Sequence, residues 1–352
     1  LLTATADSAQ RTLSIEVTPT GVANAIVVNS GVIDVSATAT AIVNGNQGPV
    51  TQTTAPAFAL AIGDGIDQYV SGDPATASVD NSGSLTVSAA AAASGVTDAA
   101  AVAIATGISQ VASAVAVDLD FFFHLVTVTR TDGFGHITTT FQTFTPTGSA
   151  FALTNVGLAT VNLDNSGLID VDAIGSAVAG SAASAAAFAA GAFQNAFGTS
   201  ANANAVNSAT IDVFASAFAS GTSAVASAGA IGLGQFLAGT AMNATFSNTG
   251  ELLVEAFAQA TGPTTATVTG AAFASAIGYQ VVGAGGGTLN VDVFNSGSSI
   301  IVGAGAVAPG TAVASALGIG ITNLPTITAT GTLGNPVAGN LTNAGLIDVL
   351  AF

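Results

Sequence analysis

The sequence predicts an all-β protein, a parallel β-solenoid (β-helix) of about six 42-residue repeats with an inserted β-hairpin. Three observations predict it: a motif resembling NSGLIDV recurs along the chain, the apolar positions around it keep the parity of a strand, and a glutamine recurs at a set distance from it. Repeats of this kind bury a continuous core only by stacking on one another.

The motif begins at an asparagine, and its clearest copy runs from Asn165 to Val171. The seven copies begin at Asn29, Asn81, Asn165, Asn207, Asn248, Asn295 and Asn343. Positions two before and four and six after this asparagine are apolar in nearly every copy, and Ser299 is the exception at the fourth position. These positions share parity, as one buried strand face requires, and helical spacing does not fit.

A second landmark is a glycine followed a few residues later by a glutamine. The glutamines are Gln68, Gln110, Gln194, Gln235 and Gln280. Three of them lie 13 residues before the next motif asparagine, and a motif asparagine lies 28 or 29 residues before the next glutamine. The period is therefore about 42 residues. One repeat forms either one large coil with three long strands, which we favour slightly, or two coils of about 21 residues.

Alanine-rich stretches such as SAVASAGAIGLGQ connect the landmarks. Alanine has the best helix propensity, but these stretches also hold glycine and β-branched residues, and they lack caps and charged faces. Their alternation of small and apolar residues instead suits strands stacked so closely that only Ala, Gly and Ser fit between layers. We expect strands here.

The recurring asparagines predict a structural ladder at one corner of the solenoid. Asn and Gly tolerate the backbone angles that tight corners need, and asparagines at equivalent corners can bond to one another as in cross-β stacks. The glutamines predict a second ladder, at a corner or in the interior. The functional alternative for the asparagine row is a sugar- or ion-binding site.

Domain boundaries follow from the repeats. Residues 1–28 form an N-terminal strand segment that could pair between subunits, 29–116 hold repeats 1–2, 117–150 form a hairpin arm, 151–342 hold repeats 3–6, and 343–352 are a truncated half repeat. Neither end carries an evident cap, and unpaired strand edges are templates for further strands. We expect the C-terminal fragment of one subunit to be completed by the N-terminal segment of the next, which gives an open filament. The candidate subunit contacts are Leu13, Ile15, Val17, Phe121, Phe122, Phe123, Leu346, Ile347, Val349 and Phe352.

Composition excludes several function classes. The chain holds 2 basic and 19 acidic residues, so it lacks the cationic clusters that hold a phosphate backbone or an anionic lipid surface. It contains no Cys, hence no disulfide and no thiolate site. No stretch is long and apolar enough to predict a membrane span. The chain begins without Met or a basic leader, so we expect a secreted mature protein, extracellular or on the cell surface.

Little in the sequence predicts chemistry. With no Lys and two Arg, no acid–base constellation assembles, and we expect no enzyme and no cofactor. An aspartate recurs five residues after the motif asparagine, at Asp34, Asp170, Asp212 and Asp348. Ca²⁺ could bridge such carboxylates, although a solvated acidic face is the default. His124 and His136 lie in the hairpin, where we do not expect them to share a metal.

The motif N-S-G-x-I-x-V and the segment GGTLNVDVFNSG (286–297) resemble the repeats of bacterial surface β-solenoids, namely haemagglutinin-type adhesins, autotransporter passengers and extracellular fibre proteins. The resemblance implies secretion, rigidity and a role in adhesion or matrix. We therefore predict a structural subunit of an extracellular filament, a surface fibre or biofilm matrix, whose partners are copies of itself and, beyond them, cell-surface or matrix polysaccharide. The alternative is a monomeric adhesin stalk or carbohydrate-binding passenger.

Overall fold

The computed structural model describes the backbone of residues 3–17, 21–43, 56–131, 137–263, 268–296, 299–323 and 337–352. Side chains are described for residues 21–43, 56–115, 156–263, 268–278, 288–296, 299–318 and 340–352. The regular structure throughout these ranges is β-strand, and most of it forms a parallel β-solenoid, as the sequence predicts.

Three stacks of parallel strands build the solenoid. The first stack contains β2 (Ala23–Asn29), β5 (Ala75–Asn81), β10 (Leu158–Asn165), β13 (Ser200–Asn207), the later parts of β15 (Ser223–Asn248) and β17 (Val268–Asn295), and β20 (Val337–Asn343). The second stack contains β3 (Val32–Ile42), β6 (Ser84–Gly95), β11 (Leu168–Ala179), β14 (Thr210–Ser220), β16 (Glu251–Thr261), β18 (Ser299–Val307) and β21 (Leu346–Ala351). The third stack contains β4 (Ala57–Ser71), β7 (Asp98–Ser113), β12 (Ala182–Phe197), the earlier parts of β15 and β17, and β19 (Thr311–Asn323).

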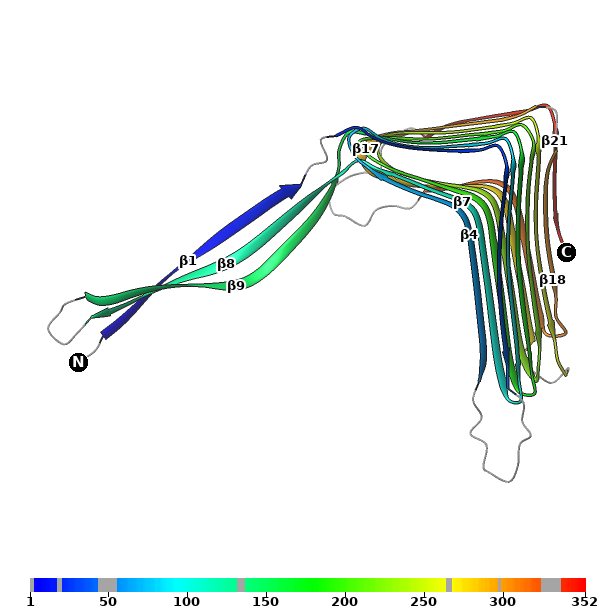
Figure 1. Cartoon of the computed structure of the whole chain (residues 1–352), viewed down its shortest axis with the longest axis horizontal. Helices are drawn as coiled ribbons and strands as arrows, with labels where there is room; N and C mark the ends of the chain where they lie inside the picture. The colour runs from blue at the N-terminus through cyan, green and yellow to red at the C-terminus, as the bar shows by residue number, and fades with distance from the viewer. Residues whose placement is uncertain are drawn as a thin grey trace, which may run out of the picture.

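Each repeat passes once through the three stacks, so one repeat is one coil of three strands. The register confirms this, because Asn165 pairs with Asn207 in the first stack and Gln194 pairs with Gln235 in the third. Figure 1 shows that the coil is bent like the letter L. The first stack forms the outer side of the upper limb, and the second stack forms the outer side of the descending limb. The strands of the third stack line the inside of both limbs.

A column of small residues marks the bend of the third stack: Gly65, Gly107, Gly191, Gly232, Ala276 and Gly318. The alternation of buried and exposed residues shifts phase here, so that Gly107 and the following Ile108 are both buried. A Cβ added at Gly107 would lie 2.5 Å from the carbonyl oxygen of Gly191 and 2.9 Å from Cγ2 of Val171. Glycine therefore lets the inner strand turn the corner against the apolar residues of the second stack.

The interior is thin and built mainly from alanine, as the alternating Ala-rich stretches predict. Positions such as Ala101, Ala103 and Ala185 are fully or almost fully buried. Larger residues gather at the corner between the first and second stacks, where Ile169 and Val171 are fully buried opposite the glycine column. Small side chains allow the inner and outer strands to approach closely, which explains the unusual composition of the chain.

The sixth coil departs from the predicted alignment by one residue. Ile300 pairs with Leu252 and is fully buried, and Val302 pairs with Val254. The prediction that Ser299 and Ile301 hold the fourth and sixth motif positions was therefore wrong. One extra residue between the motif asparagine and the strand accounts for the apparent exception at Ser299.

The inserted segment and the N-terminal strand together form a separate antiparallel sheet, the arm, with strand order β1-β8-β9. β8 (Val115–Thr131) and β9 (Ile137–Asn155) form the predicted hairpin, and β1 (Thr3–Val17) pairs with β8 along all 15 of its residues. At its base, Val156 N–H donates to the carbonyl oxygen of Ala114. Figure 1 shows the arm projecting from the free end of the upper limb.

Candidate functional surfaces

The predicted asparagine ladder is formed by all seven motif asparagines. From Asn29 to Asn295, the Nδ2 of each donates to the Oδ1 of the asparagine in the next coil, at 2.7 to 2.9 Å, and Asn343 is the last acceptor. The five asparagines between the end members are fully buried. Every bond points the same way along the solenoid, so the ladder has a direction.

The same amide groups fix the corner between the first and second stacks. Nδ2 of Asn81 also donates to the carbonyl oxygen of Leu168, and that of Asn207 donates to the carbonyl oxygen of Glu251. In return, the backbone N–H groups of Ser166 and Gly167 donate to the carbonyl oxygen of Asn81. A buried amide needs such partners for each of its polar atoms, so the ladder is best explained as structural.

The glutamine ladder lies in the interior of the upper limb and points in the opposite direction. Nε2 of Gln110 donates to Oε1 of Gln68 at 3.0 Å, and the bonds from Gln194 to Gln110 and from Gln235 to Gln194 repeat this arrangement. Each glutamine also donates to a first-stack carbonyl oxygen, as Gln110 does to Asn162 at 2.9 Å. The ladder therefore ties the inner layer to the outer layer.

The strand register moves Gln280 out of line with this ladder, contrary to the prediction, and its side chain lies outside the described residues. The register places Tyr279 beside Gln235 and moves Gln280 one position along, opposite Phe236. Oε1 of Gln235 is buried and has no hydrogen-bond partner. Among the described side chains, the glutamine ladder therefore has four members, while the asparagine ladder continues through the later coils.

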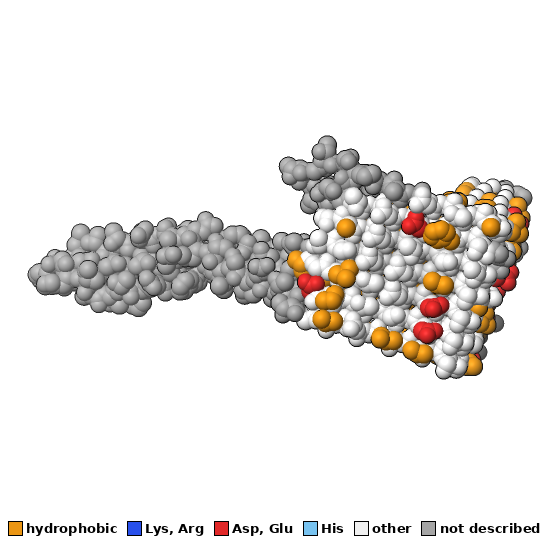
Figure 2. All heavy atoms as spheres, turned by 90° about the horizontal axis from the view of Figure 1, so that it is seen from above, with side chains coloured by type: hydrophobic (Ala, Val, Ile, Leu, Met, Phe, Trp, Pro, Cys, Tyr) orange, Lys and Arg blue, Asp and Glu red, His pale blue; other side chains and the backbone are white. Residues whose placement is uncertain are grey.

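Further asparagines stack on the outer face of the first stack, which Figure 2 shows from above as a largely uncharged polar surface with scattered apolar and acidic side chains. Nδ2 of Asn243 donates to Oδ1 of Asn202 at 2.8 Å, and Asn290 donates to Asn243 in the same way. These asparagine–asparagine hydrogen bonds resemble those of the buried ladder, but they are exposed or half-buried, so water competes for the same polar groups.

The aspartate row on the outer face of the second stack is interrupted. Asp170 lies beside Asp212, but Thr86 separates Asp34 from Asp170. Burial, with the nearby carboxylates of Asp170, Asp172, Glu255 and Glu251 adding to it, raises the pKa of Asp212 to about 6. Burial likewise raises the pKa of Asp170, and burial together with the charge of Asp170 raises that of Asp172.

Metal-ligating groups do not gather in the part of the chain that the structure describes, where no cluster of three or more His, Asp or Glu could hold an ion. The side chains of His124 and His136 lie outside the described residues, as do those of the candidate contacts Leu13, Ile15, Val17, Phe121, Phe122 and Phe123. The backbone of β1 nevertheless places Leu13 opposite Phe121.

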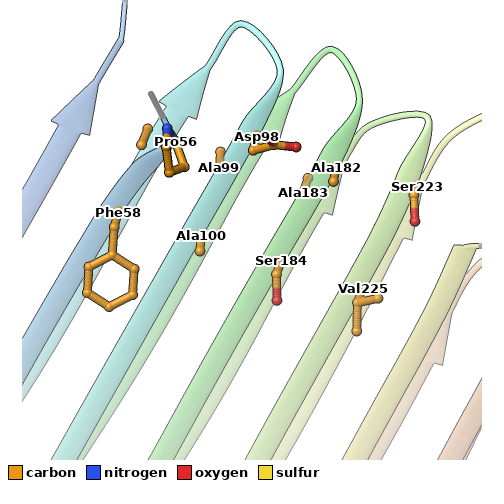
Figure 3. A pocket seen from close by; sticks show the side chains of 11 residues that line it. Pro56, Phe58, Asp98, Ala99, Ala100, Ala182, Ala183, Ser184, Ser223 and Val225 are labelled. Atoms are coloured by element: carbon orange, nitrogen blue, oxygen red, sulfur yellow. The ribbon is translucent and has the colours of Figure 1, made fainter. Parts of the chain in front are cut away.

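The inner face of the L is largely apolar, and its acidic side chains are Asp64 and Asp67 on β4 and Asp98 at the start of β7. Figure 3 shows a shallow depression on the third stack, in which Phe58 and Val225 flank the smaller Ala100 and Ser184. Asp98 is its one carboxylate. Nearer the bend, the rings of Phe188 and Phe193 stack with centroids 6.2 Å apart and planes at 6°.

The two end coils expose apolar side chains that are buried elsewhere in the stack. Leu341 and Val349 in the last coil are 58% and 42% exposed, whereas the residues paired with them in the preceding coil, Val293 and Val302, are 2% and 1% exposed. Of the other predicted contacts in this coil, Leu346 and Phe352 are exposed and Ile347 is half-buried. Among the described strands, those of the first and last coils pair on one side only.

Comparisons with known proteins add no further constraint: no protein-family model, curated protein or solved structure matches the chain. Within the described residues, no helix is long and apolar enough to cross a membrane.

Proposed function

We propose that the chain is a structural subunit of an extracellular filament, a surface fibre or matrix fibre, in which copies stack end to end through their solenoids. The observation that carries the proposal is the match between the two end coils and the interior of the stack. The strands of the first and last coils carry the same motif residues as the interior strands. Inside the molecule, equivalent strands with these residues pair from coil to coil.

Hydrophobic burial favours this association. Leu341 and Val349 occupy positions that are nearly inaccessible in interior coils. A second copy placed on the end coil would bury the exposed half of each side chain, which contributes about 1 kcal/mol per residue. The unpaired strand edges would at the same time gain backbone hydrogen bonds.

The N-terminal strand has a different role from the one that its sequence suggests. β1 pairs with β8 of its own chain, so it is engaged in the arm of the single molecule. The end-to-end contact that we propose therefore uses β2 and β3 at one end and β20 and β21 at the other. The proposed contact is still strand addition between two chains, and the strands that pair are those of the stacked solenoid coils.

Charge and composition support an extracellular fibre. A net charge of −17 repels neighbouring filaments and keeps them dispersed. The resemblance of the repeats to bacterial surface solenoids favours secretion. The protein would act as a scaffold without catalysis, with rigidity arising from its backbone and amide ladders.

Electron microscopy of the purified protein, with one matched pair of variants, tests the proposal. The wild-type protein should form uniform filaments. Val349→Glu places a charge on the end surface and should abolish most filaments, whereas Val178→Glu, at the similarly exposed outer face of β11, should leave them intact. Isolated short rods of wild-type protein under all conditions would refute the proposal.

The second candidate function is a monomeric adhesin or carbohydrate-binding passenger. The inner face favours it, because Phe188 and Phe193 present stacked rings on a concave, largely apolar surface. Isolated rods that bind a polysaccharide, with binding lost in Phe188→Ala, would support this alternative.

A further inference from the structure

The direction of the asparagine ladder gives the two ends of the solenoid different hydrogen-bonding groups. Inside the molecule, Nδ2 always belongs to the earlier coil and Oδ1 to the later one. At the last coil, Nδ2 of Asn343 donates, among the described residues, to the carbonyl oxygen of Gly345 alone. At the first coil, the one bond that Oδ1 of Asn29 accepts from the described part of the chain is the 3.2 Å bond from the N–H of Gly31.

These groups are complementary to each other. An interior asparagine such as Asn207 uses Nδ2 for the next asparagine and also for two carbonyl oxygens. Asn343 therefore retains donor capacity at its end, and Asn29 retains acceptor capacity. Two first coils facing each other would oppose two acceptors, and two last coils would oppose two donors.

We propose, on the basis of the function proposed above, that the partner of the last coil is the first coil of a second copy, in parallel register, with Nδ2 of Asn343 donating to Oδ1 of that copy's Asn29. β20 then pairs with β2 of the next copy, and β21 pairs with β3. The asparagine ladder continues from copy to copy without a break, and the filament is polar.

The register of this contact follows from the motif. Leu346 lies opposite Val32 of the next copy, Ile347 opposite Ile33 and Val349 opposite Val35. Inside the molecule, Ile33 pairs with Leu85 and Val35 with Val87, so the contact repeats combinations that the fold already uses. Among the described residues, the first and second stacks contain seven strands each, and the third stack contains six, from β4 to β19.

Cysteine cross-linking tests the register, because the chain contains no cysteine of its own. Val32 and Leu346 are 78% and 58% exposed, so substitution spares the core. Directly paired strand residues lie within the Cα separation that a disulfide spans. Filaments of Val32→Cys/Leu346→Cys should give a series of covalently linked oligomers under mild oxidation. Each single variant should form filaments without covalent links between subunits.

An internal pair shows that the geometry permits the bond. Val32 and Ser84 are neighbours in the same register within one chain, so Val32→Cys/Ser84→Cys should close an intramolecular disulfide. If this control closes while filaments of the intermolecular pair remain uncrosslinked, the proposed register is wrong, although the filament itself stands. Covalent dimers of either single variant would show a head-to-head or tail-to-tail contact and overturn the polarity. Absence of filaments altogether would instead refute the function proposed above.

Asn343→Asp tests the hydrogen bond itself. An aspartate at this position still accepts from Nδ2 of Asn295, as Asn343 does, but it has no donor for the next copy. The critical concentration for assembly at neutral pH should rise at least about tenfold. Thr342→Asp, on the outer face of the same strand opposite Phe294, adds the same charge without touching the ladder and should change the critical concentration less than about threefold. Equal effects of the two variants would contradict the ladder contact.

Discussion

The asparagine and glutamine ladders are built from the same amide group and have different fates. The asparagine ladder passes through all seven coils, while the glutamine ladder ends at Gln235, where Tyr279 occupies the next position. The asparagine lies at a corner that also fixes the chain direction through backbone carbonyl groups. The glutamine ties two layers that alanine packing already holds together. The comparison teaches that a ladder persists where its side chain also determines the backbone path.

The largest effect is expected from a break in the middle of the asparagine ladder. Asn165→Asp still accepts from Asn81 but cannot donate to Oδ1 of Asn207, and it buries a negative charge. We expect a loss of about 4 kcal/mol in the free energy of unfolding at neutral pH. Urea denaturation would measure it. Asn162→Asp, whose Oδ1 accepts from Asn204 at the outer face, should cost less than about 1 kcal/mol, and similar losses in both variants would contradict the importance of the corner.

A break in the glutamine ladder should have a smaller effect. Gln110→Leu removes the donor to Gln68, but Gln194 keeps its bond to the carbonyl oxygen of Asn204. We expect about 2 kcal/mol of destabilisation in the same urea assay. Gln280→Ala, which lies outside the ladder register, should change stability by less than about 0.5 kcal/mol. A loss at Gln280 as large as that at Gln110 would restore the original prediction for this residue.

Carboxylates stacked in the second stack should repel where amides attract. The folded-state pKa of Asp212, about 6, lies above its ordinary value of 3.8. The folded state therefore holds more protons between these values, and its stability is highest below about pH 4 and falls as pH rises through 6. Because the site is half-exposed and screened by solvent, we expect a loss of about 1 kcal/mol between pH 4 and 7.5. Urea midpoints across this range should show the decline, and Asp212→Asn should reduce it.

The smallest effect is expected from repair of the glutamine ladder. Tyr279→Gln supplies a donor for the buried Oε1 of Gln235, which has no partner. We expect a gain of up to about 1 kcal/mol in the free energy of unfolding, whereas Tyr279→Leu should give none. A gain in the leucine variant as well would mean that loss of the tyrosine, and not a new hydrogen bond, is responsible.

The sequence was sufficient for the solenoid, the period and the asparagine ladder, because each follows from residues that recur at constant spacing. It was insufficient where the spacing changes by one residue, as at Ser299 and Gln280, since only strand pairing shows where the extra residue is accommodated. The L shape was not predicted, although its glycine column was visible beside the glutamines. The pairing of β1 with β8 joins residues 100 to 128 positions apart in the sequence, and no motif marks it.

The central claim is that one ladder of asparagines continues through a molecule and into the next copy. Electron cryomicroscopy of filaments tests it most directly. Seven layers per subunit, each about 4.8 Å thick, predict a polar filament with an axial rise of about 34 Å per subunit and Asn343 in contact with Asn29 of the next copy. A filament with a twofold axis across it, or a subunit contact that leaves β2 and β20 apart, would contradict the account.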